Sequence, residues 1–148
     1  MNKCYNHLEI SADTVTLCAM RSDIVDRNGR VSFDTLIPLP EDTPAGSPWY
    51  LNSWGVVNNA SESHVEWLPE VQALNAIFAT PLCPPMVWLR ALAAKYPDAL
   101  MRMSSASHDA DVHLQHSIQG GLVKLDVAES MSFHKNYWSE VLGAEIMA

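Results

Sequence analysis

The clearest pattern of hydrophobic and polar positions lies between residues 73 and 107. Residues 75–80 form a short apolar run, which is typical of a buried strand. Residues 86–96 then place apolar side chains at i, i+3, i+4 and i+7, the spacing of one helix face, and prolines stand before and after them. Because residues 99–103 are strand-like again, the segment predicts a strand, a helix and a strand packed in an α+β layer.

The first part of the chain predicts another strand and another helix. Polarity alternates over residues 4–10, which indicates a half-buried strand with Leu8 and Ile10 on its inner side. Asp13 has the residue type of a helix N-cap, and apolar residues follow it at helical spacing. We expect this helix to continue as far as the turn at Gly29.

Residues 30–70 keep neither the helical nor the strand period of apolar residues for long, and they are rich in proline and aromatic residues. We expect an irregular insertion that either caps the core or forms a binding loop. We favour capping, because tryptophan and tyrosine side chains bury a large area in folded proteins. Within this insertion, residues 54–57 are expected to enter a strand.

A hairpin and a helix are expected near the C-terminus. Residues 111–119 alternate in polarity, Gly120-Gly121 has the form of a two-residue turn, and residues 122–126 return as a second strand. Residues 133–142 carry aromatic and apolar side chains at helical spacing, and the glycine directly after them is expected to end that helix.

Composition limits the kinds of partner. The 148 residues are 48% hydrophobic and 18% charged, which suits one domain over residues 1–148. Nine Lys and Arg against seventeen Asp and Glu leave a formal charge of −8. This balance argues against a general phosphate-binding surface, and we do not expect direct nucleic-acid binding. The acidity suits either simple solubility or a basic partner.

Cysteine usage and hydropathy indicate a compartment. Cys4, Cys18 and Cys83 are widely spaced and odd in number, which fits reduced thiols better than disulfides or a zinc site. No apolar run is long enough to cross a bilayer, and the first residues are too polar for a signal peptide. We therefore expect a cytoplasmic protein with no membrane partner.

One candidate for metal chemistry precedes the predicted hairpin. Asp109, Asp111 and His113 would share a strand face, with His108 and His116 close by, and could hold a divalent ion. The other interpretation is a polar entrance to the hairpin. We favour it, because one strand supplies too few convergent ligands, and we expect no metal and no cofactor.

A candidate for thiol chemistry is Cys83, which sits at a strand-to-helix turn just before Pro84. A helix N-terminus there would lower the pKa of the thiol and favour nucleophilic attack. No recognisable Cys/His pattern surrounds it, so we favour a packed or hydrogen-bonding turn residue.

The chain carries four short motifs in this order: Cys4-Tyr5-Asn6-x-Leu8-x-Ile10-Ser11-x-Asp13, Phe33-x-x-Leu36-Ile37-Pro38-x-Pro40-Glu41, Trp49-Tyr50-x-x-x-Trp54-Gly55 and Phe78-x-Thr80-x-x-x-Pro84-Pro85. Motifs of this kind occur in the same order in the YubB-like proteins of phages and conjugative plasmids, and the chain resembles that family over residues 4–124.

The resemblance implies a ferredoxin-like antiparallel sheet with helices packed on one face and no iron–sulfur cluster. To this the chain would add the aromatic insertion and the C-terminal helix. The resemblance also implies a mobile-element origin and no catalytic residues. Val57 and Asn58 depart from the family, which often has a basic residue and a further tryptophan there. A partner that contacts this segment would therefore differ from the family's partner.

Taken together, these observations favour a non-enzymatic accessory protein of a phage or plasmid, acting in the host cytoplasm by binding a host protein or ribonucleoprotein complex. One such role is to inhibit a host defence system such as CRISPR or restriction, because an acidic surface can occupy a basic nucleic-acid channel. We expect the partner contacts at aromatic and acidic positions of the insertion, namely Trp49, Tyr50, Trp54, Trp67, Glu41, Asp42, Glu62 and Glu66.

Two alternatives stay open at this point. The first is a small metal-dependent or thiol hydrolase that uses the Asp109 group or Cys83. The second is a self-associating structural module, since ferredoxin-like sheets often pair by edges or faces, which would make the protein a homodimer.

Overall fold

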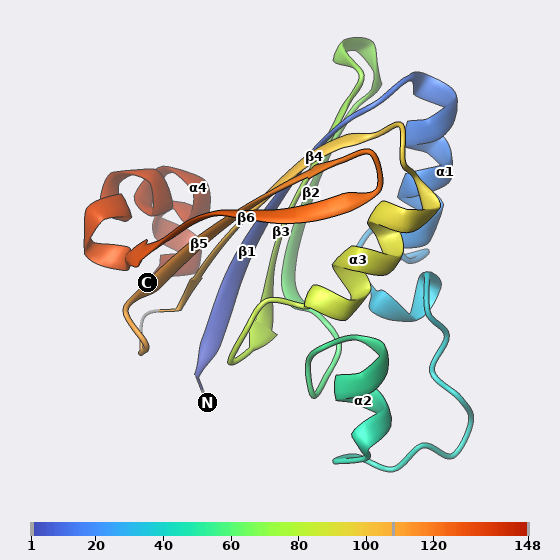
Figure 1. Cartoon of the computed structure of the whole chain (residues 1–148), viewed down its shortest axis with the longest axis horizontal. Coiled ribbons are helices and arrows are strands. Elements are labelled where there is room, and N and C mark those ends of the chain that lie inside the picture. Colours follow the sequence, from blue (N-terminus) through green and yellow to red (C-terminus); the bar gives the residue numbers. More distant parts are fainter. Residues whose placement is uncertain (1, 108, 148) are drawn as a thin grey trace.

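The computed structural model describes residues 2–107 and 109–147, so His108 lies outside the described residues. Over this part of the chain the protein is an α+β structure with one open, six-stranded antiparallel sheet and four α-helices (Figure 1). The strands are β1 (Lys3–Ser11), β2 (Ser61–Leu68), β3 (Ala73–Pro81), β4 (Leu100–Ser107), β5 (Val112–Gln119) and β6 (Leu122–Ser130). The helices are α1 (Thr14–Ile24), α2 (Pro48–Ser53), α3 (Met86–Lys95) and α4 (Lys135–Met147).

The two faces of the sheet carry different helices. The strand order is β2-β3-β1-β4-β5-β6, so β1 lies between β3 and β4 and is antiparallel to both. Helices α1 and α3 cover one face, whereas α4 lies against the opposite face (Figure 1). The sequence predicted helices on one face, and it did not indicate that the C-terminal helix takes the other.

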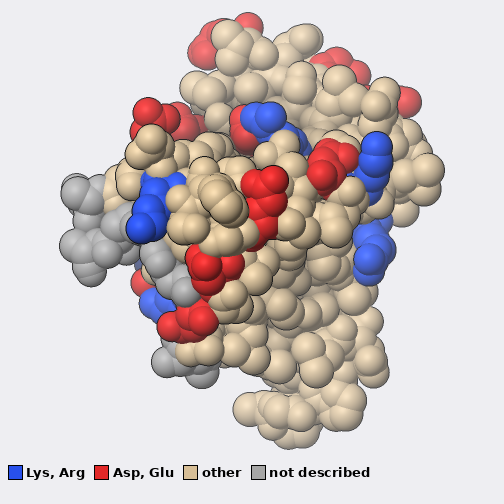
Figure 2. Space-filling model, turned by 60° about the vertical axis from the view of Figure 1, so that its left-hand side comes forward, with Lys and Arg blue, Asp and Glu red and all other residues tan. Residues whose placement is uncertain are grey.

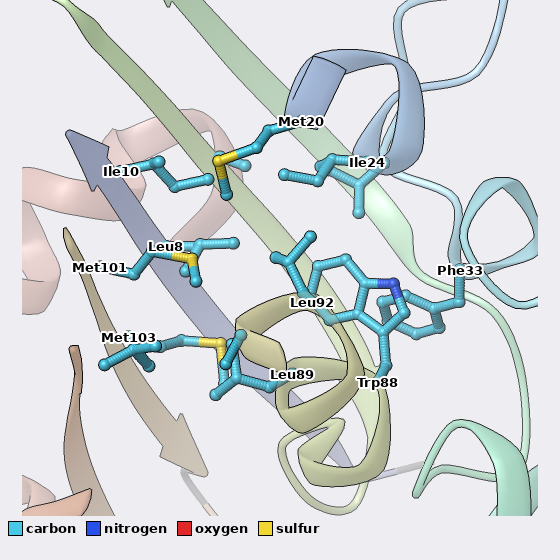
Figure 3. Close-up of a cluster of buried hydrophobic side chains, with 14 of the residues drawn as sticks. Leu8, Ile10, Met20, Ile24, Phe33, Trp88, Leu89, Leu92, Met101 and Met103 are labelled. Atoms are coloured by element: carbon cyan, nitrogen blue, oxygen red, sulfur yellow. The ribbon is translucent and has the colours of Figure 1, made fainter. Parts of the chain in front are cut away.

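The main core lies between the sheet and the helices α1 and α3. Alternation along β1 directs Leu8 and Ile10 into this core, as predicted. Side chains from the three central strands, the two helices and the 3₁₀ helix Phe33–Thr35 meet there (Figure 3), among them Met20, Ile24, Phe33, Trp88, Leu89, Leu92, Met101 and Met103. Full burial of each of these apolar side chains stabilises the fold by about 1.5–3 kcal/mol.

Helix α1 begins where the sequence predicts and ends earlier. The Asp13 carboxylate accepts a hydrogen bond from the backbone N–H of Thr16 at 2.8 Å, which confirms the N-cap. The helix stops at Ile24 instead of continuing to Gly29. Val25 leaves the helix to form a β-bridge with Val31, and this extended pairing competes with another helical turn.

The predicted irregular insertion contains a strand that the sequence analysis missed. Residues 54–57 form a turn, and the strand is β2, with Ser61 as its first residue. This strand is at the edge of the sheet and is only half buried, so polar residues dominate it and the apolar signal is weak. Only Val65 and Trp67 pack against the main core.

The C-terminal predictions are confirmed in type and corrected in extent. Gly120 and Gly121 adopt positive φ angles in the turn between β5 and β6. Strand β6 runs to Ser130 instead of residue 126, and a short 3₁₀ helix, Met131–His134, precedes α4. Gly143 has a non-helical backbone, with a φ of 65° and a ψ of 174°, so it ends the first helical segment of α4 as predicted, and a second short segment follows it.

Helix α2 and the residues after it form a cap on one end of the core, in line with the favoured interpretation of the insertion. The indole N–H of Trp54 donates to the carbonyl of Ile37 at 3.0 Å, and its ring packs edge-on against Phe33. The carbonyl of Trp54 accepts the backbone N–H of Trp88 at 3.2 Å, in the first turn of α3. A helix N-terminus has free N–H groups, so this contact satisfies one of them.

Gly55 allows this close approach. Its φ is +84°, and a Cβ built there would lie 2.9 Å from the backbone nitrogen of Val87. A side chain at this position would meet backbone atoms of α3, which cannot move aside without displacing the helix.

We expect Gly55→Ala to destabilise the protein much more than Gly46→Ala. Both glycines have a positive φ, which costs alanine about 1–2 kcal/mol. Only Gly55 would also overlap neighbouring backbone, which adds about 1–3 kcal/mol, whereas nothing lies within 4 Å of a Cβ at Gly46. Urea unfolding of the two variants measures the difference, and equal losses would contradict the close contact.

Candidate partner-binding surface

The cap presents an uncharged surface in a strongly acidic protein. No Asp, Glu, Lys or Arg occurs between residues 43 and 61, and we call the exposed side of this segment the cap surface. Leu51 and Val57 are 52% and 44% exposed on it. Figure 2 shows charged side chains over the upper part of its view and none over the lower part, which lies at the height of α2 in Figure 1.

The cap surface has acidic residues beside it. Glu41 and Asp42 are exposed in the loop that leads into α2. The hydroxyl of Thr43 donates to the carbonyl of Pro40 at 2.7 Å, which closes this loop into a turn around the two carboxylates. Protein interfaces commonly have a core depleted of charge and a polar rim, and this arrangement has both.

Aromatic side chains support the cap from within. Trp49, Tyr50 and Trp54 pack edge to face in all three pairs, with ring centroids 5.1–5.6 Å apart. Tyr50 and Trp54 are only 9% and 1% exposed, so they stabilise the cap and leave almost no side-chain surface accessible to a partner. Trp49 is half-buried and is the member of this aromatic group that reaches the surface.

The other three predicted contact residues lie apart from the cap, on strand β2. Glu62 forms an ion pair with Lys3 at 2.7 Å. Glu66 is exposed and pairs across the sheet with Asn75, while Trp67 points to the opposite face. Among the described residues, no hydrogen bond or ion pair joins this β2 group to the cap. The structure therefore divides the predicted set into two groups.

Sequence reasoning missed Leu51 and Val57, although the charge-free run was visible in the sequence. All four aromatic residues that the sequence predicted as anchors are buried or half-buried, and three of them lie in the cap. The length of the uncharged segment in a chain of charge −8 was the signal that could have located the surface.

The candidate metal ligands do not converge. The Asp111 carboxylate accepts a hydrogen bond from the Ser130 hydroxyl at 2.6 Å, while His113 is 1% exposed and points toward α4. Asp109 is exposed. Within residues 2–107 and 109–147, no three His, Cys, Asp or Glu side chains are placed to hold a metal ion together.

Cys83 lacks the features of an activated nucleophile. Its thiol donates a hydrogen bond to the carbonyl of Gly55 at 3.6 Å, which ties the turn before α3 to the cap. Burial raises the pKa of the Cys83 thiol above its ordinary value of 9.0. The thiol is therefore protonated at neutral pH, and this favours its role as a turn residue.

Histidines on the sheet hold α4 in place. Nδ1 of His113 accepts the indole N–H of Trp138 at 2.9 Å, and its ring stacks on His134 with centroids 3.7 Å apart. Nε2 of His134 lies 2.7 Å from a carboxylate oxygen of Glu129. Because Nδ1 of His113 is an acceptor, this side chain is neutral and carries its proton on Nε2, which has no partner among the described residues.

A second histidine contact fastens the same helix. Nδ1 of His7 lies 2.7 Å from the hydroxyl of Tyr137. Burial lowers the pKa of His7 below 6.5, although the nearby carboxylates of Glu9 and Glu66 oppose this effect. Burial also lowers the pKa of His113, with a further contribution from His134. Both histidines are therefore neutral at pH 7.

No family model, curated protein or solved structure matches the chain. In the described part of the chain, none of the helices has both the length and the apolar composition that a membrane span requires.

We expect the free energy of unfolding to fall as the pH is lowered through 6.5. The pKa of each of these histidines is lower in the folded protein than in the unfolded chain. Their contribution to stability is therefore complete when the pH is above the pKa of the unfolded chain. It is lost as the pH falls below that pKa, because the unfolded chain then takes up the proton more readily than the folded protein does. Urea unfolding of the wild type and His113→Phe measures the effect. The variant should lose less stability between about pH 7.5 and 5.5.

His64→Asn is the matched control, because His64 is exposed on β2. It should show the same pH dependence as the wild type. An unchanged pH dependence in His113→Phe would contradict the assignment of this effect to the contact between His113 and α4.

Proposed function

We propose that this chain is a non-enzymatic accessory protein that binds a host protein through the cap surface. One observation carries the proposal: an exposed, charge-free segment with two exposed aliphatic side chains lies within a chain of charge −8. A partner that covered Leu51 and Val57 would remove their exposed apolar area from water, which favours binding. The candidate catalytic groups, by contrast, are dispersed or protonated.

The chemistry of the surface favours a partner with an apolar contact region and basic surroundings. The cap surface offers Leu51, Val57 and the accessible part of Trp49, and Glu41 and Asp42 lie in the adjoining loop. The overall charge would attract a basic protein over distance, and the apolar contact would hold it.

Both edge strands carry charged side chains, such as Glu66 on β2 and Lys124 on β6, which disfavours self-association through the edges.

We further propose that the fold is ferredoxin-like and that the protein comes from a phage or plasmid. Two features support the ferredoxin-like assignment: the order β1-α1-β2-β3-α3-β4, with α2 inserted between α1 and β2, and the strand order β2-β3-β1-β4 within the sheet. The resemblance of the four sequence motifs to those of YubB-like proteins supports the mobile-element origin. A host defence complex such as CRISPR or restriction fits the partner chemistry, because its nucleic-acid channel is basic.

The experiment is capture of tagged protein with its partner from a nuclease-treated host lysate, followed by mass spectrometry and repetition over a salt series. We expect to recover one basic host protein or complex, and we expect its recovery to fall as the salt concentration rises. The double variant Leu51→Asp/Val57→Asp should lower its recovery about tenfold or more, because charges would be placed in an apolar contact.

Val15→Asp is the matched control, since Val15 is 83% exposed on α1, away from the cap. It should leave recovery unchanged. Thermal unfolding of each variant shows whether the fold is retained. Equal recovery with the double variant and the wild type, or recovery of the bait alone, would contradict the proposal.

A further inference from the structure

Two of the five arginine side chains of this acidic protein line one hollow. A hollow of about 680 Å³ lies between the second half of α1, the turn that follows it and strand β2. Its lining includes Arg21, Arg27, Asp26 and Trp67. We call it the arginine hollow. Its volume is within the range of about 300–1,000 Å³ that is typical of small-molecule sites.

The basic residues at this hollow have no ion-pair partners. Of the nine Lys and Arg residues, four form ion pairs with carboxylates in the described part of the chain, namely Lys3, Lys95, Arg102 and Lys124. Neither Arg21 nor Arg27 has an ion pair or a side-chain hydrogen bond among the described residues. Their N–H groups are therefore available to a ligand.

Trp67 holds one of these guanidinium groups in position. The central guanidinium carbon of Arg21 lies 4.9 Å from the centroid of the Trp67 ring. A cation–π contact uses the charge of the guanidinium and none of its N–H donors. Arg21 is thus oriented at the wall of the hollow while its hydrogen-bonding groups stay unused, which lowers the entropic cost of binding an anion.

One oxygen of the single carboxylate in the lining is already engaged. Oδ1 of Asp26 accepts the backbone N–H groups of Asn28 at 2.9 Å and Arg30 at 3.1 Å, so it shapes the turn. The carbonyls at the end of α1 are also used, because Val25 donates to Arg21 and Ser32 donates to Ile24. Two guanidinium groups against one carboxylate leave the lining with a net positive charge.

We propose that the arginine hollow binds a small molecule that carries a phosphate group. One arginine fork satisfies the two oxygens of a carboxylate, whereas a phosphate has three terminal oxygens and can engage both guanidiniums. The surrounding charge of −8 disfavours a long polyanion, such as a nucleic acid, and admits a small ligand. This inference is independent of the cap surface and of the function proposed for it.

The test is a titration of ¹⁵N-labelled protein with inorganic pyrophosphate, followed by NMR of the arginine Nε–H and tryptophan indole signals. We expect saturable shifts of Arg21, Arg27 and Trp67. Arg21→Gln/Arg27→Gln should weaken binding about tenfold or more. Arg90→Gln removes an exposed arginine of α3 outside the hollow and should leave the affinity unchanged.

Two comparison ligands test the chemical class. Citrate supplies carboxylates without phosphate, and it should bind more weakly than pyrophosphate. A short single-stranded oligonucleotide supplies a polyanion, and it should bind no more tightly. The proposal is overturned by shifts that do not saturate at millimolar pyrophosphate, by equal weakening in Arg90→Gln, or by tighter binding of either comparison ligand. Amide spectra of the variants establish that the fold is retained.

Discussion

The contact between the Trp54-Gly55 turn and the start of α3 is the constraint on which the outer part of this structure depends. Helix α3 follows two prolines and has no side-chain N-cap, so the carbonyl of Trp54 supplies an acceptor for the N–H of Trp88. The backbones approach so closely that only glycine fits at position 55 without displacement. The cap is thereby fixed to the same helix that covers the sheet.

This attachment gives the cap an inner and an outer side with different roles. The inner side contains Trp54 and Tyr50, whose rings extend the main core beyond the sheet. The outer side contains Leu51 and Val57. The exposed area of these side chains does not contribute to the stability of the fold. A rigid support beneath exposed aliphatic side chains reduces the entropy lost on binding, because the cap does not have to become ordered when a partner arrives.

The sequence was informative where burial is one-sided and periodic. Strand β1 and helix α3 have a buried face with a clear period, so both could be predicted with their inner residues. Strand β2 could not, because an edge strand with one half-buried face retains little apolar alternation. The attachment of α4 depends on pairs distant in sequence, such as His113 and Trp138, and no local pattern encodes such pairs. The sequence indicated the insertion that contains the candidate surface, while burial decides which of its residues reach solvent.

Hydrogen–deuterium exchange of the protein, free and in complex with its captured partner, shows which residues the partner covers. We expect added protection concentrated in residues 48–58, where α2 and the following turn carry the cap surface. Protection confined to β6, α4 or the arginine hollow, with unchanged exchange in residues 48–58, would contradict the assignment of the cap as the binding surface.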